Sequence, residues 1–204
     1  MRAFELIVTV ASGAPGDDGQ WRYRQTNRVV RDHLRAARRA KAILVLDIQP
    51  GRSPFMDEVR HLRRWLKEPD VSIALDPEWS MDAGQVPGRQ IGDTDAATVN
   101  RVSRYMADVV ERGNLPQKLL IVHQFTEDMI KDKPSLRRRE GIALVLNVDG
   151  FGDQPNKISK YDAFTDGPRR THYGFKLFYE EDTNLMSPRE VLRLRPRPDV
   201  VMYE

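Results

Sequence analysis

Six separate stretches of this 204-residue chain run apolar and then end on polar, mostly ionisable residues. A parallel strand has this near-continuous Val/Ile/Leu character when helices cover both faces of its sheet. The stretches are AILVLDIQPG, VSIALDPEW, LLIVHQF, IALVLNVDG, HYGFKLFYEED and DVVMYE, and residues 4–10 form a further strand ahead of them. The chain therefore predicts about seven parallel strands.

Segments with helical periodicity lie between these strands, at residues 26–40, 53–66 and 95–111. Strand–helix units with right-handed crossovers form either a doubly wound sheet or a barrel. We predict a (β/α) TIM-like barrel in a single domain over residues 1–204, because the polar strand ends are not gathered at one switch point. Seven strands leave three alternatives: an incomplete barrel, an irregular strand hidden in the pattern, or a strand ahead of Met1.

The carboxyl ends of barrel strands meet at one mouth, where reactive groups lie. Asp76 and Glu78 follow the strand VSIAL and, two residues apart, point to the same side. Two close carboxylates separate their pKa values, so one can hold a proton as a general acid while the other stays ionised. In the alternative, Asp76 caps the following turn and Glu78 pairs with an arginine such as Arg89.

Other strand ends are expected to complete this site. Asp47 and Asp149 would act as base or electrostatic stabiliser beside Glu78 and Asp76. The residues predicted to line the cleft and contact a substrate are Gln49, Trp79, His123, Gln124 and Lys176.

Two of these residues allow other chemistry. His123 suits a Zn²⁺ or Mn²⁺ site, but the chain has no H-x-H or H-E-x-x-H motif, so we predict a hydrogen-bonding role and neither a metal nor another cofactor. Lys176 in an apolar strand could form a Schiff base, whereas pairing with Asp149 is the simpler expectation.

Composition and charge exclude several classes of protein. The absence of cysteine removes thiol chemistry, and no run of residues reaches the length of a membrane span. The start of the chain mimics a signal peptide, but Glu5 interrupts its short apolar stretch. The tight basic runs Arg137–Arg139 and Arg169–Arg170 lack the interleaved aromatic residues of a nucleic-acid groove, so we interpret both as solvated loops and predict no nucleic-acid partner.

The strings LDIQPGR, ALDPEW, GRQIG, LPQKLLIVHQF, NVDGFGDQPNK and FKLFYEEDT, in this order, resemble a family of actinobacterial, often secreted or lipoprotein-type, barrel proteins. The resemblance spans about residues 4–204 and implies a glycosidase-like (β/α) barrel. Separately, Asp76-Pro77-Glu78 is similar to the D-x-E motif of barrel muramidases and chitinases, which implies Glu78 as the general acid.

These observations predict a barrel that acts on or binds a cell-wall or surface polysaccharide. The alternative is a non-catalytic adhesion or structural module, for instance in the tail of an actinobacterial virus, with protein assembly partners. A metal-dependent hydrolase is a third hypothesis. The resemblance implies an extracellular, cell-surface or virion location, although the chain shows no signal peptide of its own.

Overall fold

One curled sheet of eight strands forms the centre of the molecule, in the order β10-β9-β8-β6-β4-β3-β1-β2. The computed structural model describes residues 1–167 and 171–204, so Arg169–Arg170 lie outside the described residues. The strands are β1 (Arg2–Ala11), β2 (Arg22–Arg24), β3 (Ala42–Ile48), β4 (Val71–Leu75), β6 (Lys118–Gln124), β8 (Ile142–Val148), β9 (His172–Leu177) and β10 (Val200–Tyr203). All neighbouring strands pair in parallel except β1 and β2, which are antiparallel.

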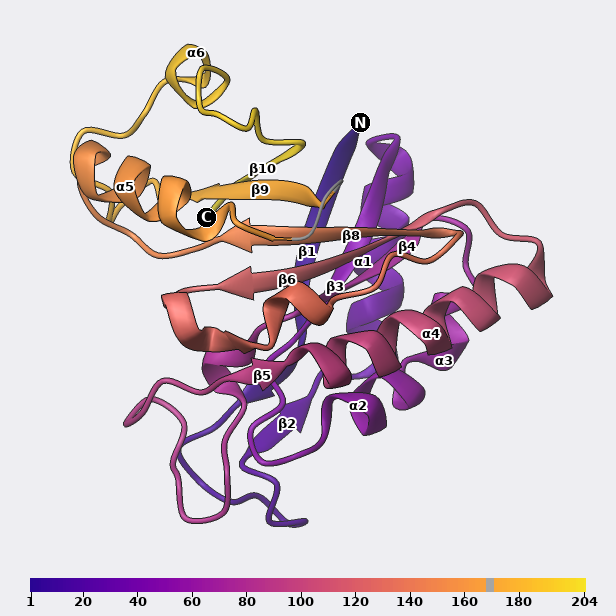
Figure 1. Cartoon of the computed structure of the whole chain (residues 1–204). Helices are drawn as coiled ribbons and strands as arrows, with labels where there is room; N and C mark the ends of the chain where they lie inside the picture. Colours follow the sequence, from indigo (N-terminus) through magenta and orange to yellow (C-terminus); the bar gives the residue numbers. More distant parts are fainter. Residues whose placement is uncertain (168–170) are drawn as a thin grey trace.

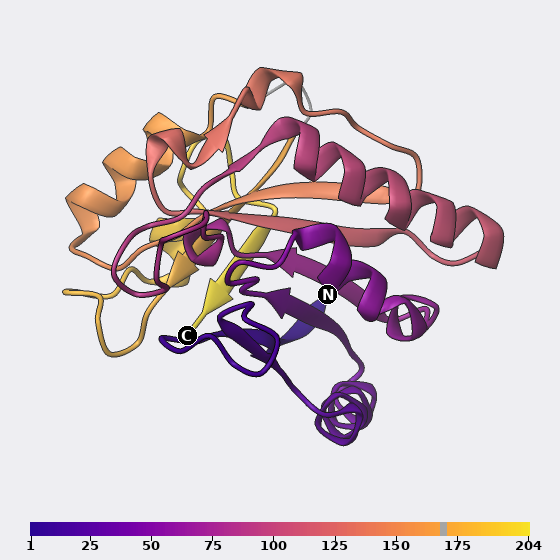
Figure 2. The ribbon, with the colours of Figure 1, turned by 90° about the horizontal axis from the view of Figure 1, so that it is seen from below.

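Helices lie on the outer, convex side of this sheet and form an arc around it in Figure 2. They are α1 (Asn27–Arg39), α2 (Phe55–His61), α3 (Arg63–Leu66), α4 (Ala96–Gly113), α5 (Gln154–Phe164) and α6 (Pro188–Val191). Side chains of Thr26, Asp95 and Asp153 accept hydrogen bonds from main-chain N–H groups of the first turns of α1, α4 and α5. The helices expected at residues 26–40 and 95–111 are confirmed, and the one expected at 53–66 divides into α2 and α3.

Shorter elements complete the chain between these helices and strands. A second, two-stranded sheet pairs β5 (Thr94–Asp95) with β7 (Ile130–Lys131) in parallel. Single 3₁₀ turns are η1 (Pro77–Trp79), η2 (Glu127–Met129) and η3 (Lys133–Ser135).

The predicted TIM-like barrel is wrong. Seven parallel strands do occur at the expected places, but the sheet curls into a half-barrel, and no hydrogen-bonded pairing joins β10 to β1 in the described residues. In Figure 1, β1 crosses the direction of β8 and β9 at a steep angle, as expected for a strongly twisted sheet. Part of the physical reason lies at β2, whose residues Arg22–Arg24 pair with Thr9–Ala11 and so occupy the outer edge of β1 at its carboxyl end.

A buried charge network secures β2. The carboxylate of Glu58 in α2 is fully buried and accepts hydrogen bonds from Arg22 Nε at 2.9 Å and from Arg24 Nε at 2.7 Å. The hydroxyls of Ser53 and Thr9 donate to the same carboxylate at 2.6 and 3.3 Å. Because such a buried carboxylate needs all its partners, this network ties β2 to β1 and α2.

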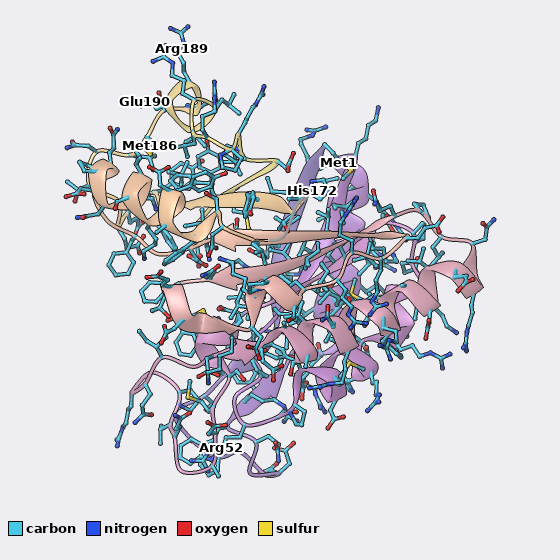
Figure 3. All side chains as sticks on the ribbon, viewed as in Figure 1. Met1, Arg52, His172, Met186, Arg189 and Glu190 are labelled. Atoms are coloured by element: carbon cyan, nitrogen blue, oxygen red, sulfur yellow. The ribbon has the colours of Figure 1, made fainter. Side chains whose placement is uncertain are left out.

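The open side of the half-barrel exposes its interior. The inward side chains Val45, Ala74, Ile121 and Val145 form a small apolar cluster, separate from the larger core under the helices. A slot of about 550 Å³ opens onto Val45, Ile121 and Val145 between β1 and β10, bounded by residues that include Ala3, Glu5 and Val200–Tyr203. Met1 and His172, labelled in Figure 3, lie on this slot where β1 and β9 begin.

Register explains how polar residues reach the other end of the interior. Successive side chains of a strand alternate between its two faces, so the apolar inward residues Val45, Ala74, Ile121 and Val145 are followed two positions later by Asp47, Asp76, His123 and Asn147. The strand pair His123↔Asn147 keeps two of the polar positions level, whereas Asp47 lies level with the apolar Ala74 of the neighbouring strand. Along each of these strands, the inward side chains therefore change from apolar to polar near the carboxyl end.

The loops at this end are fastened to one another. The guanidinium of Arg52, labelled in Figure 3, lies over the ring of Trp21 at 4.4 Å and donates from Nε to the carbonyl of Gln85 at 2.9 Å. These contacts join the loops after β1, β3 and η1. No helix within the described residues is long and apolar enough to span a membrane, as predicted.

Candidate functional site

A cavity of about 710 Å³ lies at the carboxyl ends of the parallel strands, toward which the arrowheads of β6 and β8 point in Figure 1. We call it the mouth cavity. Seven of the residues predicted from the sequence line it, namely Asp47, Gln49, Asp76, Glu78, Trp79, Asp149 and Lys176. The other two, His123 and Gln124, are each only 1% exposed and do not line the cavity.

His123 lies below the cavity and holds one of its carboxylates. Its Nδ1 is 2.8 Å from Asp149 Oδ2, and the amide Nδ2 of Asn147 approaches the same ring nitrogen at 3.3 Å. Burial opposes a positive charge on His123, but the carboxylates of Asp149 and Glu5 outweigh it, so the pKa of the imidazole is raised well above its ordinary value.

Lys176 binds the same carboxylate from the other side, as the simpler of the two sequence interpretations predicts. Its Nζ is 3.3 Å from Asp149 Oδ2 and 2.6 Å from Glu204 Oε2. Although burial opposes its charge, these two carboxylates raise the pKa of Lys176, which favours an ammonium over the neutral amine that a Schiff base requires.

Asp149 is the firmly ionised carboxylate of the mouth cavity. Burial alone would raise its pKa, but the hydrogen bond with His123, the charge of Lys176 and the backbone N–H of Gly150, which donates at 2.6 Å, lower it below the ordinary value. A fixed negative charge therefore lies at the end of β8.

The pKa values of two neighbouring carboxyl groups, Asp76 and Asp47, are shifted in the opposite direction. Burial, together with the charges of nearby acidic groups, raises the pKa of Asp76 to about 6 and raises that of Asp47 well above its ordinary value. Asp47 is 4% exposed, and its Oδ1 accepts a hydrogen bond from the N–H of Ile48 at 2.8 Å.

Glu78 lies on η1, where Pro77 at the first position favours the turn. The pKa of Glu78 is raised to about 7, mainly because the carboxyl group is half-buried and also because Asp76 and Asp149 carry negative charges nearby. The sequence alternative that pairs Glu78 with an arginine finds no support in the ion pairs of the described residues. Near neutral pH, Glu78 is therefore protonated in a part of the molecules and ionised in the rest.

A close main-chain contact fixes the position of Glu78. The N–H of Gly92 donates to the carbonyl of Glu78 at 2.7 Å. A Cβ at residue 92 would collide with the main-chain oxygens of Ser80 and Pro77, so only glycine lets the 80–93 loop approach η1 this closely.

Both glutamines predicted to bind substrate have structural contacts. Gln124 Nε2 donates to the carbonyls of Thr126 and Glu127, each at 3.2 Å, and so holds the turn after β6. Gln49 Oε1 accepts from the N–H of Ala11 at 3.3 Å, which leaves its amide nitrogen toward the mouth cavity that it lines.

Two carboxylates outside the predicted set and several aromatic rings also line the mouth cavity. Glu5 and Glu204 line the mouth cavity, and so do Tyr23, Phe125, Phe151, Phe178 and Tyr203. The signal for Glu5 was its place inside an otherwise apolar strand, where its register opposite Val45 turns it inward. Phe151 and Phe178 meet edge to face with centroids 6.1 Å apart.

Comparison of the chain with family models, curated proteins and solved structures finds no match. The chemistry of the site is therefore argued from its own geometry. The mouth cavity combines a carboxyl group that titrates near neutrality, an ionised carboxylate and a surrounding set of aromatic rings. This combination suits acid–base chemistry on a neutral, partly apolar substrate.

Proposed function

We propose that the mouth cavity binds a cell-wall or cell-surface polysaccharide and cleaves its glycosidic bonds, with Glu78 as the general acid. The observation that carries this proposal is that Asp76 and Glu78, which follow β4, and Asp149, which follows β8, line one cavity together with aromatic side chains. Glycoside hydrolysis needs two carboxyl groups in different protonation states on either side of the scissile bond.

The environments of these carboxyl groups support different roles. With a pKa near 7, Glu78 carries a proton on a large share of molecules at neutral pH and can donate it to the leaving glycosidic oxygen. Asp149 stays ionised and can stabilise positive charge at the anomeric carbon, attack that carbon as nucleophile, or accept a proton from the attacking water as base. Water supplies the hydroxyl group that completes the hydrolysis, and Glu78 regains its proton.

The aromatic side chains support a sugar ligand. Phe151 is 62% exposed, and Trp79 is half-buried beside Glu78. Sugar rings have apolar C–H faces, which pack on such rings without requiring charge on the ligand. An uncharged polymer also fits a cavity whose ionisable groups are mainly acidic, because an anionic ligand would be repelled.

The test is turnover of bacterial cell-wall polysaccharides and chitin-like polymers by the whole chain, measured as released reducing ends. We expect cleavage of at least one polymer, and a decrease of about 10² to 10⁴-fold in kcat for Glu78→Gln, the range for loss of a general acid. Glu111→Gln, an exposed change on α4, is the matched control and should leave turnover unchanged.

Two outcomes would contradict the proposal. Equal turnover by the wild type and Glu78→Gln would remove Glu78 from the chemistry. Binding of a polymer without any release of reducing ends would identify the chain as a non-catalytic carbohydrate-binding module, the adhesion alternative predicted from the sequence.

A further inference from the structure

Three potential ligand groups converge at the mouth cavity, two of them in its lining and His123 buried beside it. Glu5 on β1, Asp47 on β3 and His123 on β6 each bring one ligand atom within 4.8 Å of those of the other two. Neither Glu78 nor Asp76 belongs to this set. β1 and β3 are neighbours, but β4 lies between β3 and β6, so the curl of the sheet is what brings His123 to the other two side chains.

The imidazole of His123 supplies the observation that points to a ligand. Its Nε2 is buried and has no hydrogen-bond partner among the described residues. The carboxylate of Glu5, whose Oε1 is 3.6 Å away, is within ion-pair distance but too far for a hydrogen bond. A buried ring nitrogen without a partner is costly, and it is directed toward the two carboxylates of the set.

The other ring nitrogen of the imidazole, Nδ1, is already held by a carboxylate. Nδ1 is 2.8 Å from Asp149 Oδ2, while Asp149 Oδ1 is held by the N–H of Gly150 at 2.6 Å. Metal-binding histidines are commonly oriented in this way, with one ring nitrogen on a carboxylate and the other on the ion. Asp149 would thus be a positioning residue for the imidazole.

The carboxylates are also suited to bind an ion. Asp47 is 4% exposed, and the described hydrogen bonds engage its Oδ1 alone, with the N–H of Ile48. Glu5 lines both the mouth cavity and the slot between β1 and β10, so an ion could reach the three residues from either side.

We propose that Glu5, Asp47 and His123 bind one divalent transition-metal ion, Zn²⁺ or Mn²⁺. One imidazole nitrogen with two carboxylate oxygens suits these ions, whereas Mg²⁺ and Ca²⁺ prefer oxygen ligands alone. This site shares the positioning residue Asp149 with the proposed glycan cleavage but uses neither Glu78 nor its proton, so metal binding and cleavage can be tested separately. It replaces the sequence expectation that the chain holds no metal.

The test uses the full chain, stripped with a chelator and titrated with Zn²⁺ alone and with Mn²⁺ alone by calorimetry. We expect one ion per chain for at least one metal, a raised Tm in its presence and a shifted ¹⁵N resonance of His123 Nε2 with little change at Nδ1. Glu5→Gln should weaken binding by about tenfold or more, since even changes beyond the ligands have effects of this size.

Glu204→Gln is the matched control, because it removes the same charge from the mouth cavity at a residue outside the set. Its affinity for the metal should stay within a few-fold of the wild type. Absence of stoichiometric binding, an unmoved His123 resonance, or equal losses in Glu5→Gln and Glu204→Gln would each overturn the proposal. Because Glu5 is accessible at the open edge of the sheet, Glu5→Gln should fold, which the Tm without metal checks.

Discussion

The Nδ1 atom of His123 on β6 lies 2.8 Å from Oδ2 of Asp149, the residue that follows β8. This contact, with Lys176 at 3.3 Å from the same oxygen, keeps Asp149 ionised inside the molecule. A fixed negative charge is thereby held close enough to Glu78 to help raise its pKa to about 7. The His123–Asp149 pair thus contributes to the raised pKa of Glu78 in the mouth cavity.

The first prediction concerns the pH dependence of glycan cleavage. Glu78 must be protonated to donate, and burial with the nearby carboxylates raises its pKa to about 7. Turnover should therefore fall as pH rises through about 7, and this limb should be absent from any residual activity of Glu78→Gln. A profile that keeps the same limb in the variant would assign the titration to another group.

The second prediction tests the electrostatic link to Lys176. Its positive charge lowers the pKa of Glu78, so Lys176→Met should raise that pKa and move the decline in turnover to higher pH. The variant should also lose about 3 kcal/mol of stability, because Asp149 and Glu204 lose a partner in a largely buried site. An unchanged pH profile, with the loss of stability present, would disprove the link.

The third prediction concerns the Glu58 network. Burial opposes the charge of Glu58, but hydrogen bonds from Arg24, Ser53 and Arg22 outweigh it and lower its pKa. Glu58→Gln should cost about 3–5 kcal/mol in urea unfolding, the range for breaking a buried ion pair.

The same network predicts an acid limb of stability. Because the folded-state pKa of Glu58 is depressed, its contribution is fully present above the unfolded-state value and is lost as pH falls through the folded-state value. The wild type should lose stability in this acidic range more steeply than Glu58→Gln. The exposed Glu111→Gln should follow the wild type, and equal slopes in all three proteins would contradict this assignment.

The fourth prediction concerns sugar binding at the edge of the cavity. Phe151 is exposed and packs against Phe178, so Phe151→Ala should fold normally and lose only ligand contact. Affinity for a bound oligosaccharide should fall by roughly three- to tenfold, in proportion to the modest energy of one aromatic contact. Replacement of Tyr179, an exposed ring that does not line the cavity, is the control and should leave affinity unchanged.

The seven parallel strands of the large sheet and the helices α1 and α4 could be predicted from the sequence because their signals are local. A buried parallel strand is a continuous apolar run, as in Ala42–Ile48, and an amphipathic helix repeats its apolar residues with a fixed period. The same runs place polar residues at the strand ends, which is why seven of the predicted residues share one cavity.

Closure of the barrel could not be predicted in this way. The three residues of β2, Arg22–Arg24, carry no apolar pattern. They form a strand because they pair with β1 and because their arginines bind the buried Glu58. Whether a sheet of seven parallel strands closes depends on such edge contacts and on twist, neither of which leaves a periodic signal.

The roles within the site also depend on three-dimensional contacts. Glu5 is a single acidic residue in an apolar strand, and only the register with Val45 shows that it turns inward. The unpartnered Nε2 of His123 results from the fold around it, so the sequence favoured a hydrogen-bonding histidine over a metal ligand.

The central claim is that the mouth cavity presents the Glu78 carboxyl group to a glycosidic bond. A crystal structure of Glu78→Gln with an oligosaccharide of the polymer that the wild type cleaves tests it most directly. We predict that the side chain of residue 78 lies within hydrogen-bond distance of a glycosidic oxygen, with Asp149 on the side of the anomeric carbon. A sugar chain bound away from residue 78, or outside the mouth cavity, would contradict the account.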